Sequence, residues 1–190
     1  MKITSISGSP HPDGNTATIL NEIERPFKEK GHDVVRYCLG KCNINYCMGC
    51  KLCEKTGECA QNDDVQTIVN GMLNSDLVII ASPSYWGDVT GQMKVFIDRC
   101  TPYCYIDKPE GESATTTKGI AVAVRAGMNK AENENLVKTI EHFLGHLNIP
   151  LISDFTVEGI NTSDDLKANP DILSEAYKFG SNIHFTLAIS

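Results

Sequence analysis

Short apolar runs alternate along this chain with longer amphipathic stretches. The runs are typical of strands buried in a sheet, and the stretches repeat apolar residues every three or four positions, as helices with one buried face do. Segment 63–75, for example, places Ile68 and Met72 on one face, with Asp63 or Asp64 capping its start. The pattern predicts strands at 2–7, 33–39, 76–82, 119–124 and 151–159, helices at about 15–30, 63–75, 90–100, 131–147 and from 164 onward, and a polar connection at 107–117.

Strands that alternate with helices and are apolar throughout indicate an α/β fold, a doubly wound parallel sheet with helices on both faces. Right-handed crossovers leave few strand orders, and we expect the common order 2-1-3-4-5. A length of 190 residues fits a single domain, here 1–190. Sheets of this kind bind ligands beyond the carboxyl ends of their strands, where the strand order reverses. The loops after the first, third and fourth strands are therefore the places to look for a site.

The overall composition narrows the choice of partners. Hydrophobic residues make up 41% and charged residues 22% of the chain, which is typical of a soluble globular protein. The net charge of -7 argues against nucleic acid or an anionic membrane as the main partner. The sequence shows no signal peptide and no run near the roughly 18 apolar residues of a membrane span. We expect a cytoplasmic protein whose thiols stay reduced.

The loop after the first strand, SISGSPHPDGNTATI, is rich in glycine and small hydroxyl side chains and ends where a helix begins. The free N–H groups of a helix start favour an anion, and a phosphate is the natural guest. The loop matches neither a dinucleotide fingerprint nor a P-loop, and it contains no lysine or arginine. The alternative is a plain turn with Asn15 as a helix cap. The candidate phosphate donors are Ser7, Ser9, Asn15, Thr16 and Ala17.

The loop after the third strand, SPSYWGDVTGQMKVFIDR, has two adjacent aromatic residues. Tyr85 and Trp86 could lie against a flat ring, and Gly87 would let backbone N–H groups approach it. Alternatively, both aromatics cover the edge of the core or an oligomer surface. We expect a solvated or subunit-contacting helix face at Lys94, Asp98 and Arg99.

The segment CMGCKLCEKTGEC carries four thiols at the spacing C-x2-C-x2-C-x5-C. A disulfide knot, a zinc site and an iron–sulfur cluster all compete to explain it. A reducing compartment disfavours disulfides, and zinc sites usually use two separated cysteine pairs. Closely spaced thiolates on one loop are typical ligands of a 4Fe–4S cluster. Zinc or no metal stays open, and the nearby Cys42 could replace a ligand. The candidate ligands are Cys47, Cys50, Cys53 and Cys59, in a cysteine-rich loop at about 40–62.

These three segments, in this order and at this spacing, resemble the flavodoxin-like NADPH-dependent FMN reductase superfamily, and within it the iron–sulfur flavoproteins of anaerobes. The resemblance is close over about the first hundred residues and then rests on VAVRAG at 122–127. It implies that FMN binds with its phosphate at the first loop and its ring at the third, and that the four cysteines hold a 4Fe–4S cluster. The residues implied near the ring are Pro83, Ser84, Tyr85, Trp86, Gly87 and, near the ring or a neighbouring subunit, Arg125.

The predicted function is electron transfer by an FMN-dependent oxidoreductase. A ferredoxin-like one-electron donor would supply the cluster, FMN would follow, and a small-molecule acceptor would take the electrons. The alternative is an NAD(P)H-dependent FMN or quinone reductase without a cluster, and a third possibility is a flavin- or zinc-binding module that acts through partners. The resemblance also implies a homodimer or homotetramer. Since the second strand lies beside the first, we expect the cluster near the flavin, in one subunit or across an interface.

Overall fold

The computed structural model describes residues 1–104 and 116–189, so most of the polar connection expected at 107–117 lies outside it. Within these ranges, parallel strands form one five-stranded sheet in the order β2-β1-β3-β4-β5. The predicted fold class and strand order are confirmed. The strands are β1 (Lys2–Ser7), β2 (Asp33–Cys38), β3 (Leu77–Pro83), β4 (Lys118–Val124) and β5 (Leu151–Val157).

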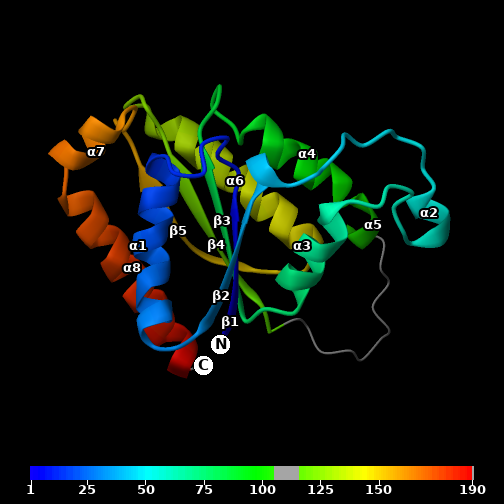
Figure 1. The fold of residues 1–190 in the computed structure, drawn as a ribbon, viewed down its shortest axis with the longest axis horizontal. Helices are drawn as coiled ribbons and strands as arrows, with labels where there is room; N and C mark the ends of the chain where they lie inside the picture. Colours follow the sequence, from blue (N-terminus) through cyan, green and yellow to red (C-terminus); the bar gives the residue numbers. More distant parts are fainter. Residues whose placement is uncertain (105–115, 190) are drawn as a thin grey trace.

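Helices cover both faces of the sheet (Figure 1). One face packs against α1 and α8, and the other against α3, α4 and α6. Among the described residues, no helix is both long enough and apolar enough to span a lipid bilayer. The helices are α1 (Asn15–Glu29), η1 (Leu39–Lys41), α2 (Cys53–Thr56), α3 (Asp64–Leu73), α4 (Gly91–Arg99), α5 (Thr101–Cys104), α6 (Lys130–His146), α7 (Ser163–Ala168) and α8 (Asp171–Ile189).

The central strand β3 shows why the sheet forms where the apolar runs predicted it. Its side chains alternate between the two faces, so that Leu77 and Ile79 contact the α1 side while Val78 and Ile80 contact the α3 side. All four are fully buried. A strand that is buried on both faces has no solvent-facing positions, and its sequence is therefore an unbroken apolar run.

The C-terminal region differs from the prediction. The single closing helix expected from residue 164 is two helices, α7 and α8. The break falls at Asn169 and Pro170. Proline disfavours helical geometry in the residue before it and suits the first turn of a new helix, so the chain stops and restarts here. As a result α7 is free to lie near the carboxyl ends of the strands, which are the end of the sheet where ligands bind.

Candidate functional site

A cavity of about 510 Å³, here called the α1 cavity, opens at the carboxyl ends of β3 and β4 and beside the start of α1. This is the position that the strand order predicted. Six of the residues proposed to bind the flavin line it: Ser9, Asn15, Thr16, Pro83, Ser84 and Tyr85.

The start of α1 is left open toward this cavity. Gly14 is the N-cap residue, no side chain accepts a hydrogen bond from the first turn, and no acidic residue lies in that turn. The alternative that Asn15 caps the helix is wrong, because Asn15 is already helical and its side-chain amide donates to the carbonyl of Thr162 at 3.0 Å. The first N–H groups of a helix have no intrahelical acceptor, so this helix start suits a phosphate.

Two serine hydroxyls without partners lie in the segments predicted to bind the flavin. The Oγ atoms of Ser7 and Ser84 are buried, and neither has a hydrogen-bond partner among the described residues. Buried polar atoms are normally paired, so such hydroxyls at a cavity indicate a missing polar ligand. Ser84 lines the α1 cavity, whereas Ser7 lies at the end of β1 with only 1% of its surface exposed. Ala17 is also buried, and only its backbone could contribute to binding.

The aromatic loop forms a tight turn. Tyr85 and Asp88 exchange backbone hydrogen bonds of 2.9 and 3.2 Å around Trp86 and Gly87, whose φ angles are 56° and 76°. A left-handed backbone is unusual for tryptophan, and α6 holds the turn in place through Asn135, which donates to the carbonyl of Gly87 at 2.8 Å. Trp86 and Gly87 do not line the α1 cavity. Trp86 is fully exposed, so it does not cover the edge of the core.

Arg125 does not line the α1 cavity either. Its neighbours Val124 and Ala126 line the α1 cavity, but its guanidinium forms an ion pair with Glu132 on α6. One wall of the cavity, at 160–167, runs into α7 and was not predicted from the sequence. The local signal was available: a threonine followed three residues later by an acidic residue marks a helix start, and Thr162 and Asp165 form this reciprocal capping box.

A second cavity of about 190 Å³, here called the cysteine cavity, lies between the cysteine loop (residues 40–62) and the junction of α4 and α5. Cys42 does not line it, and its thiol donates instead to the carbonyl of Cys38 at 3.3 Å. Burial raises the pKa of the Cys42 thiol, which makes it a poor ligand. All four predicted ligands line this cavity: Cys47, Cys50, Cys53 and Cys59.

The arrangement of these thiols bears on the competing interpretations. In the described part of the chain the cysteines are all free, and no three Cys, His, Asp or Glu side chains are grouped to hold a metal ion. A structural zinc site gathers four ligands at about 2.3 Å from a single ion, whereas a cluster distributes its thiolate ligands over several irons. Four thiols around one cavity fit a larger group with several irons. Gly49 and Gly57, with φ of 62° and 74°, allow the loop to bend around it.

The two cavities are well separated. They share no lining residue. Figure 1 places α2 at one end of the long axis and α7, beside the α1 cavity, at the other. The expected closeness of the cluster site and the flavin site within one subunit is therefore not found. The loop runs outward past α3 and α4 instead of turning back over β1 (Figure 1).

Arg99 also differs from its prediction. We expected it on a solvated or subunit-contacting face with Lys94 and Asp98, which are indeed about half exposed and pair with each other. The side chain of Arg99 is instead 1% exposed and forms an ion pair with Asp63 at 2.6 Å. Asp63 has a second role, because it caps α3 by accepting from the N–H of Val65, as the sequence predicted for Asp63 or Asp64.

Comparison with known proteins shows the family of this chain. Residues 1–161 match the family of NADPH-dependent FMN reductases. The chain belongs to this family. Two relatives are iron-sulfur flavoproteins. One, from Methanocaldococcus jannaschii, is 34% identical over 146 residues, which are 77% of this chain and 73% of the relative. The other, from Archaeoglobus fulgidus, is 38% identical over 132 residues, 70% of this chain but only 58% of the relative's length. The resemblance noted in the sequence is thus confirmed.

Solved structures extend the likeness of this FMN reductase family member to the whole fold. An azoreductase from Bacillus anthracis superimposes with a TM-score of 0.73 over 96% of this chain and 99% of its own, at 19% identity. The alternating α/β arrangement is therefore kept where sequence identity is low.

Proposed function

We propose that this protein is an FMN-dependent oxidoreductase of the electron-transfer type, built as a single FMN-binding domain with a cluster-binding cysteine loop. It would take electrons from a ferredoxin-like donor through a 4Fe–4S cluster and FMN to a small-molecule acceptor. When bound, the cluster exchanges electrons singly, and FMN can accept them singly and release them in pairs. One observation carries the proposal: four thiols line one cavity of a chain whose α1 cavity separately suits a flavin phosphate.

The chain's own residues would bind and orient the flavin. The open N–H groups of Asn15, Thr16 and Ala17 would hold the phosphate, with help from the buried hydroxyl of Ser7. The buried hydroxyl of Ser84 would lie beside the ring. Ser9 would complete this pocket, and Pro83 and Tyr85 would lie beside the ring. The half-exposed ring of Tyr85 could cover one edge of the isoalloxazine and keep water from it.

The separation of the cavities supports a homodimer or homotetramer in which the cysteine loop of one subunit reaches the α1 cavity of another. Large apolar side chains are exposed near both cavities: Tyr46 (78%) and Met48 (67%) beside the loop, and Trp86 (104%) and Met128 (76%) beside the flavin site. In the proposed assembly these side chains would lie in the subunit contact. Trp86, Gly87 and Arg125 would then act at the subunit contact. Sedimentation of the purified protein tests the assembly, and a monomer would contradict it.

Anaerobic purification followed by metal and flavin analysis tests the main proposal. We expect about four irons and one FMN per chain, and flavin reduction by a ferredoxin-type donor. Cys50→Ser should lose iron and this reduction but keep FMN, because Cys50 does not line the α1 cavity. Protein that binds flavin but no iron, even after reconstitution in vitro, would refute the cluster. We place this chemistry in the cytoplasm, where the thiols stay reduced.

The second candidate is an NAD(P)H-dependent FMN or quinone reductase without a cluster. The matched family itself favours it, since its members are described as NADPH-dependent. Rapid anaerobic bleaching of the flavin by NADPH, equal in wild type and Cys50→Ser, would select this candidate. Stoichiometric zinc without iron, and no turnover with any donor, would instead indicate a binding module.

A further inference from the structure

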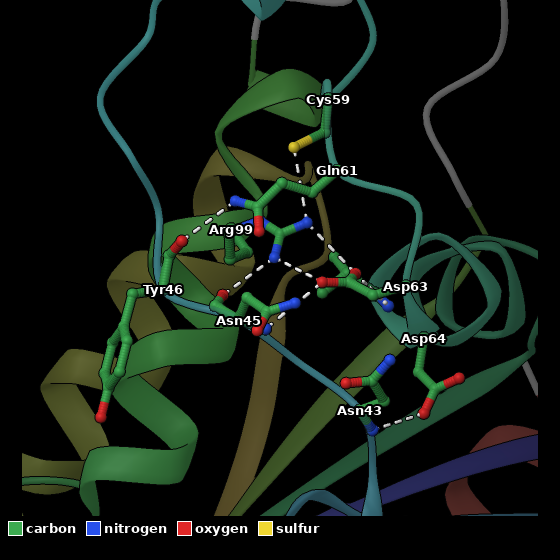
Figure 2. Close-up of polar contacts among 9 residues, drawn as sticks. Asn43, Asn45, Tyr46, Cys59, Gln61, Asp63, Asp64 and Arg99 are labelled. Carbon is green, nitrogen blue, oxygen red and sulfur yellow. Dashed lines mark hydrogen bonds and ion pairs between the residues drawn. The ribbon is translucent and has the colours of Figure 1, made fainter.

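The C-terminal residue of α4 is a buried arginine that reaches into the base of the cysteine loop. The guanidinium of Arg99 lies between the chain entering the loop, the chain leaving it and the start of α3, as Figure 2 shows. Nothing in the flavin site requires it, since Arg99 does not line the α1 cavity. It does line the cysteine cavity.

The contacts of Arg99 join three parts of the chain. Nη1 donates to the carbonyl of Asn45 at 2.8 Å and to Oδ2 of Asp63 at 2.6 Å. Nη2 donates to Oδ1 of Asp63 at 3.1 Å and to Sγ of Cys59 at 3.4 Å. These residues form what is called here the Arg99 network. It links the beginning of the loop to its last cysteine and fixes both to a helix of the core.

The loop has further polar contacts at the same point. The N–H of Asn45 donates to Asp63 at 3.3 Å, and the side-chain amide of Gln61 donates to the carbonyl of Tyr46 at 3.0 Å (Figure 2). The two ends of the loop are therefore held together by polar contacts. The cysteines between these ends lie in exposed or half-exposed positions.

Arg99 donates two hydrogen bonds to the carboxylate of Asp63 and one to the thiol of Cys59. A buried arginine is tolerated only when it is paired, and the bidentate contact with Asp63 meets that need. One N–H of the Nη2 group is not used by Asp63 and donates to the sulfur of Cys59 instead. A neutral thiol is a weak acceptor, whereas an ionised acceptor makes a markedly stronger hydrogen bond to a cation. The geometry therefore suits a deprotonated, iron-bound Cys59.

We propose that Arg99 is a positioning residue for the iron–sulfur cluster. Arg99 holds the two ends of the cysteine loop together, and its hydrogen bond to Cys59 raises the reduction potential of the cluster. The inference rests on the proposed function. Reduction adds negative charge to the cluster, and a cationic donor at a ligand sulfur stabilises the reduced form more than the oxidised form. The carboxylate of Asp63 acts in the opposite direction, because it offsets part of the arginine's charge.

Potentials of the reconstituted holoprotein test this directly, by anaerobic redox titration followed by electron paramagnetic resonance. Arg99→Met should lower the potential, and Asp63→Asn should raise it, since asparagine can still cap α3 while the counter-charge is gone. Arg99→Lys keeps the charge and should restore part of the shift. Asp64→Asn is the matched control, because Asp64 accepts from the N–H of Asn43 at 2.7 Å but makes no contact with Arg99. The cluster potential of this variant should equal that of the wild type.

Iron retention gives a second readout. In competition with a chelator, Arg99→Met should bind iron roughly 10 to 100 times more weakly than the wild type, as when other residues that orient metal ligands are replaced. FMN binding at the distant α1 cavity reports whether each variant has folded. If Arg99→Met does not fold, Arg99→Lys and Asp63→Asn decide the question.

The outcomes separate the two proposals. Potentials of Arg99→Met and Asp63→Asn that equal the wild type, or that shift in the same direction, would overturn the role of Arg99 and leave the proposed function intact. A wild-type protein that takes up no iron would overturn the proposed function, and this inference with it. Opposite shifts, with an unchanged Asp64→Asn, would support the inference.

Discussion

The α1 cavity and the cysteine cavity are built in different ways. The walls of the α1 cavity are the ends of paired strands and the start of a long helix, which the register of the sheet holds in place. The cysteine cavity lies in a loop whose regular structure is the single turn of α2 and the short η1. Its base depends on a few polar contacts around Arg99. The proposed flavin site should therefore tolerate most single changes, whereas the proposed cluster site should depend on one buried ion pair.

The largest effect on stability is expected from Arg99→Met. It leaves the carboxylate of Asp63 buried and unpaired, and breaking a buried pair in this way costs about 3–5 kcal/mol. Lys94→Met is the matched control on the same helix, because the half-exposed pair of Lys94 and Asp98 contributes about 0–1 kcal/mol. Urea unfolding of iron-free protein measures both. Equal losses in the two variants would show that the Arg99 network does not stabilise the loop.

Gly180→Ala should weaken FMN binding without affecting the cysteine cavity. A Cβ at Gly180 would lie 2.1 Å from the carbonyl oxygen of Ile23, so α8 and α1 would have to move apart, at a cost of about 1–3 kcal/mol. Because α1 begins at the proposed flavin site, FMN affinity should fall while iron content stays unchanged. Gly145→Ala on α6 meets nothing within 4 Å and should gain up to about 1 kcal/mol. Iron loss in Gly180→Ala would show that the two cavities are coupled.

Asn15→Asp tests the open helix start. A carboxylate there would repel the flavin phosphate, and a separation of about 5 Å in water predicts FMN binding on the order of tenfold weaker. Asn15→Ala removes the hydrogen bond to Thr162 without adding charge and should weaken binding much less. Fluorescence titration with FMN measures both. Equal affinities for the two variants would place the phosphate elsewhere.

The smallest effect is a pH dependence from Asp63. Burial alone would raise the pKa of Asp63, but hydrogen bonds from Arg99 and from two backbone N–H groups outweigh it and lower the pKa. The unfolded chain then takes up this proton at a higher pH than the folded protein does. The stabilisation from Asp63 is thus present above about pH 4 and is lost as the pH falls further.

Unfolding experiments across this range check the sign. The difference in free energy between wild type and Asp63→Asn should be constant near neutral pH and shrink below about pH 4. In an Arg99→Met background the same substitution should produce a weaker pH dependence, because the main partner is gone. A difference that grows as the pH falls would contradict the assignment.

The regular elements could be predicted from the sequence because their signals are local. The buried run of β3 was expected at 76–82 and lies at Leu77–Pro83. The cap at Asp63 and the gathering of four cysteines in one loop were likewise visible in short stretches of sequence. The wall of the α1 cavity near α7 was not predicted, although the pair Thr162 and Asp165 carried a local signal for it.

What the sequence determined by itself is the alternation of strands and helices and the supply of thiols, since periodicity, turns and spacing depend on neighbours along the chain. The tertiary structure decided that the two cavities lie apart and that Arg99 is buried. We expected Arg99 on a solvated face, but in the structure it is buried with Phe96 on the core side of α4, and whether a charge can remain there depends on its partner. That partner, Asp63, lies 36 residues away, and only the folded chain brings the two together.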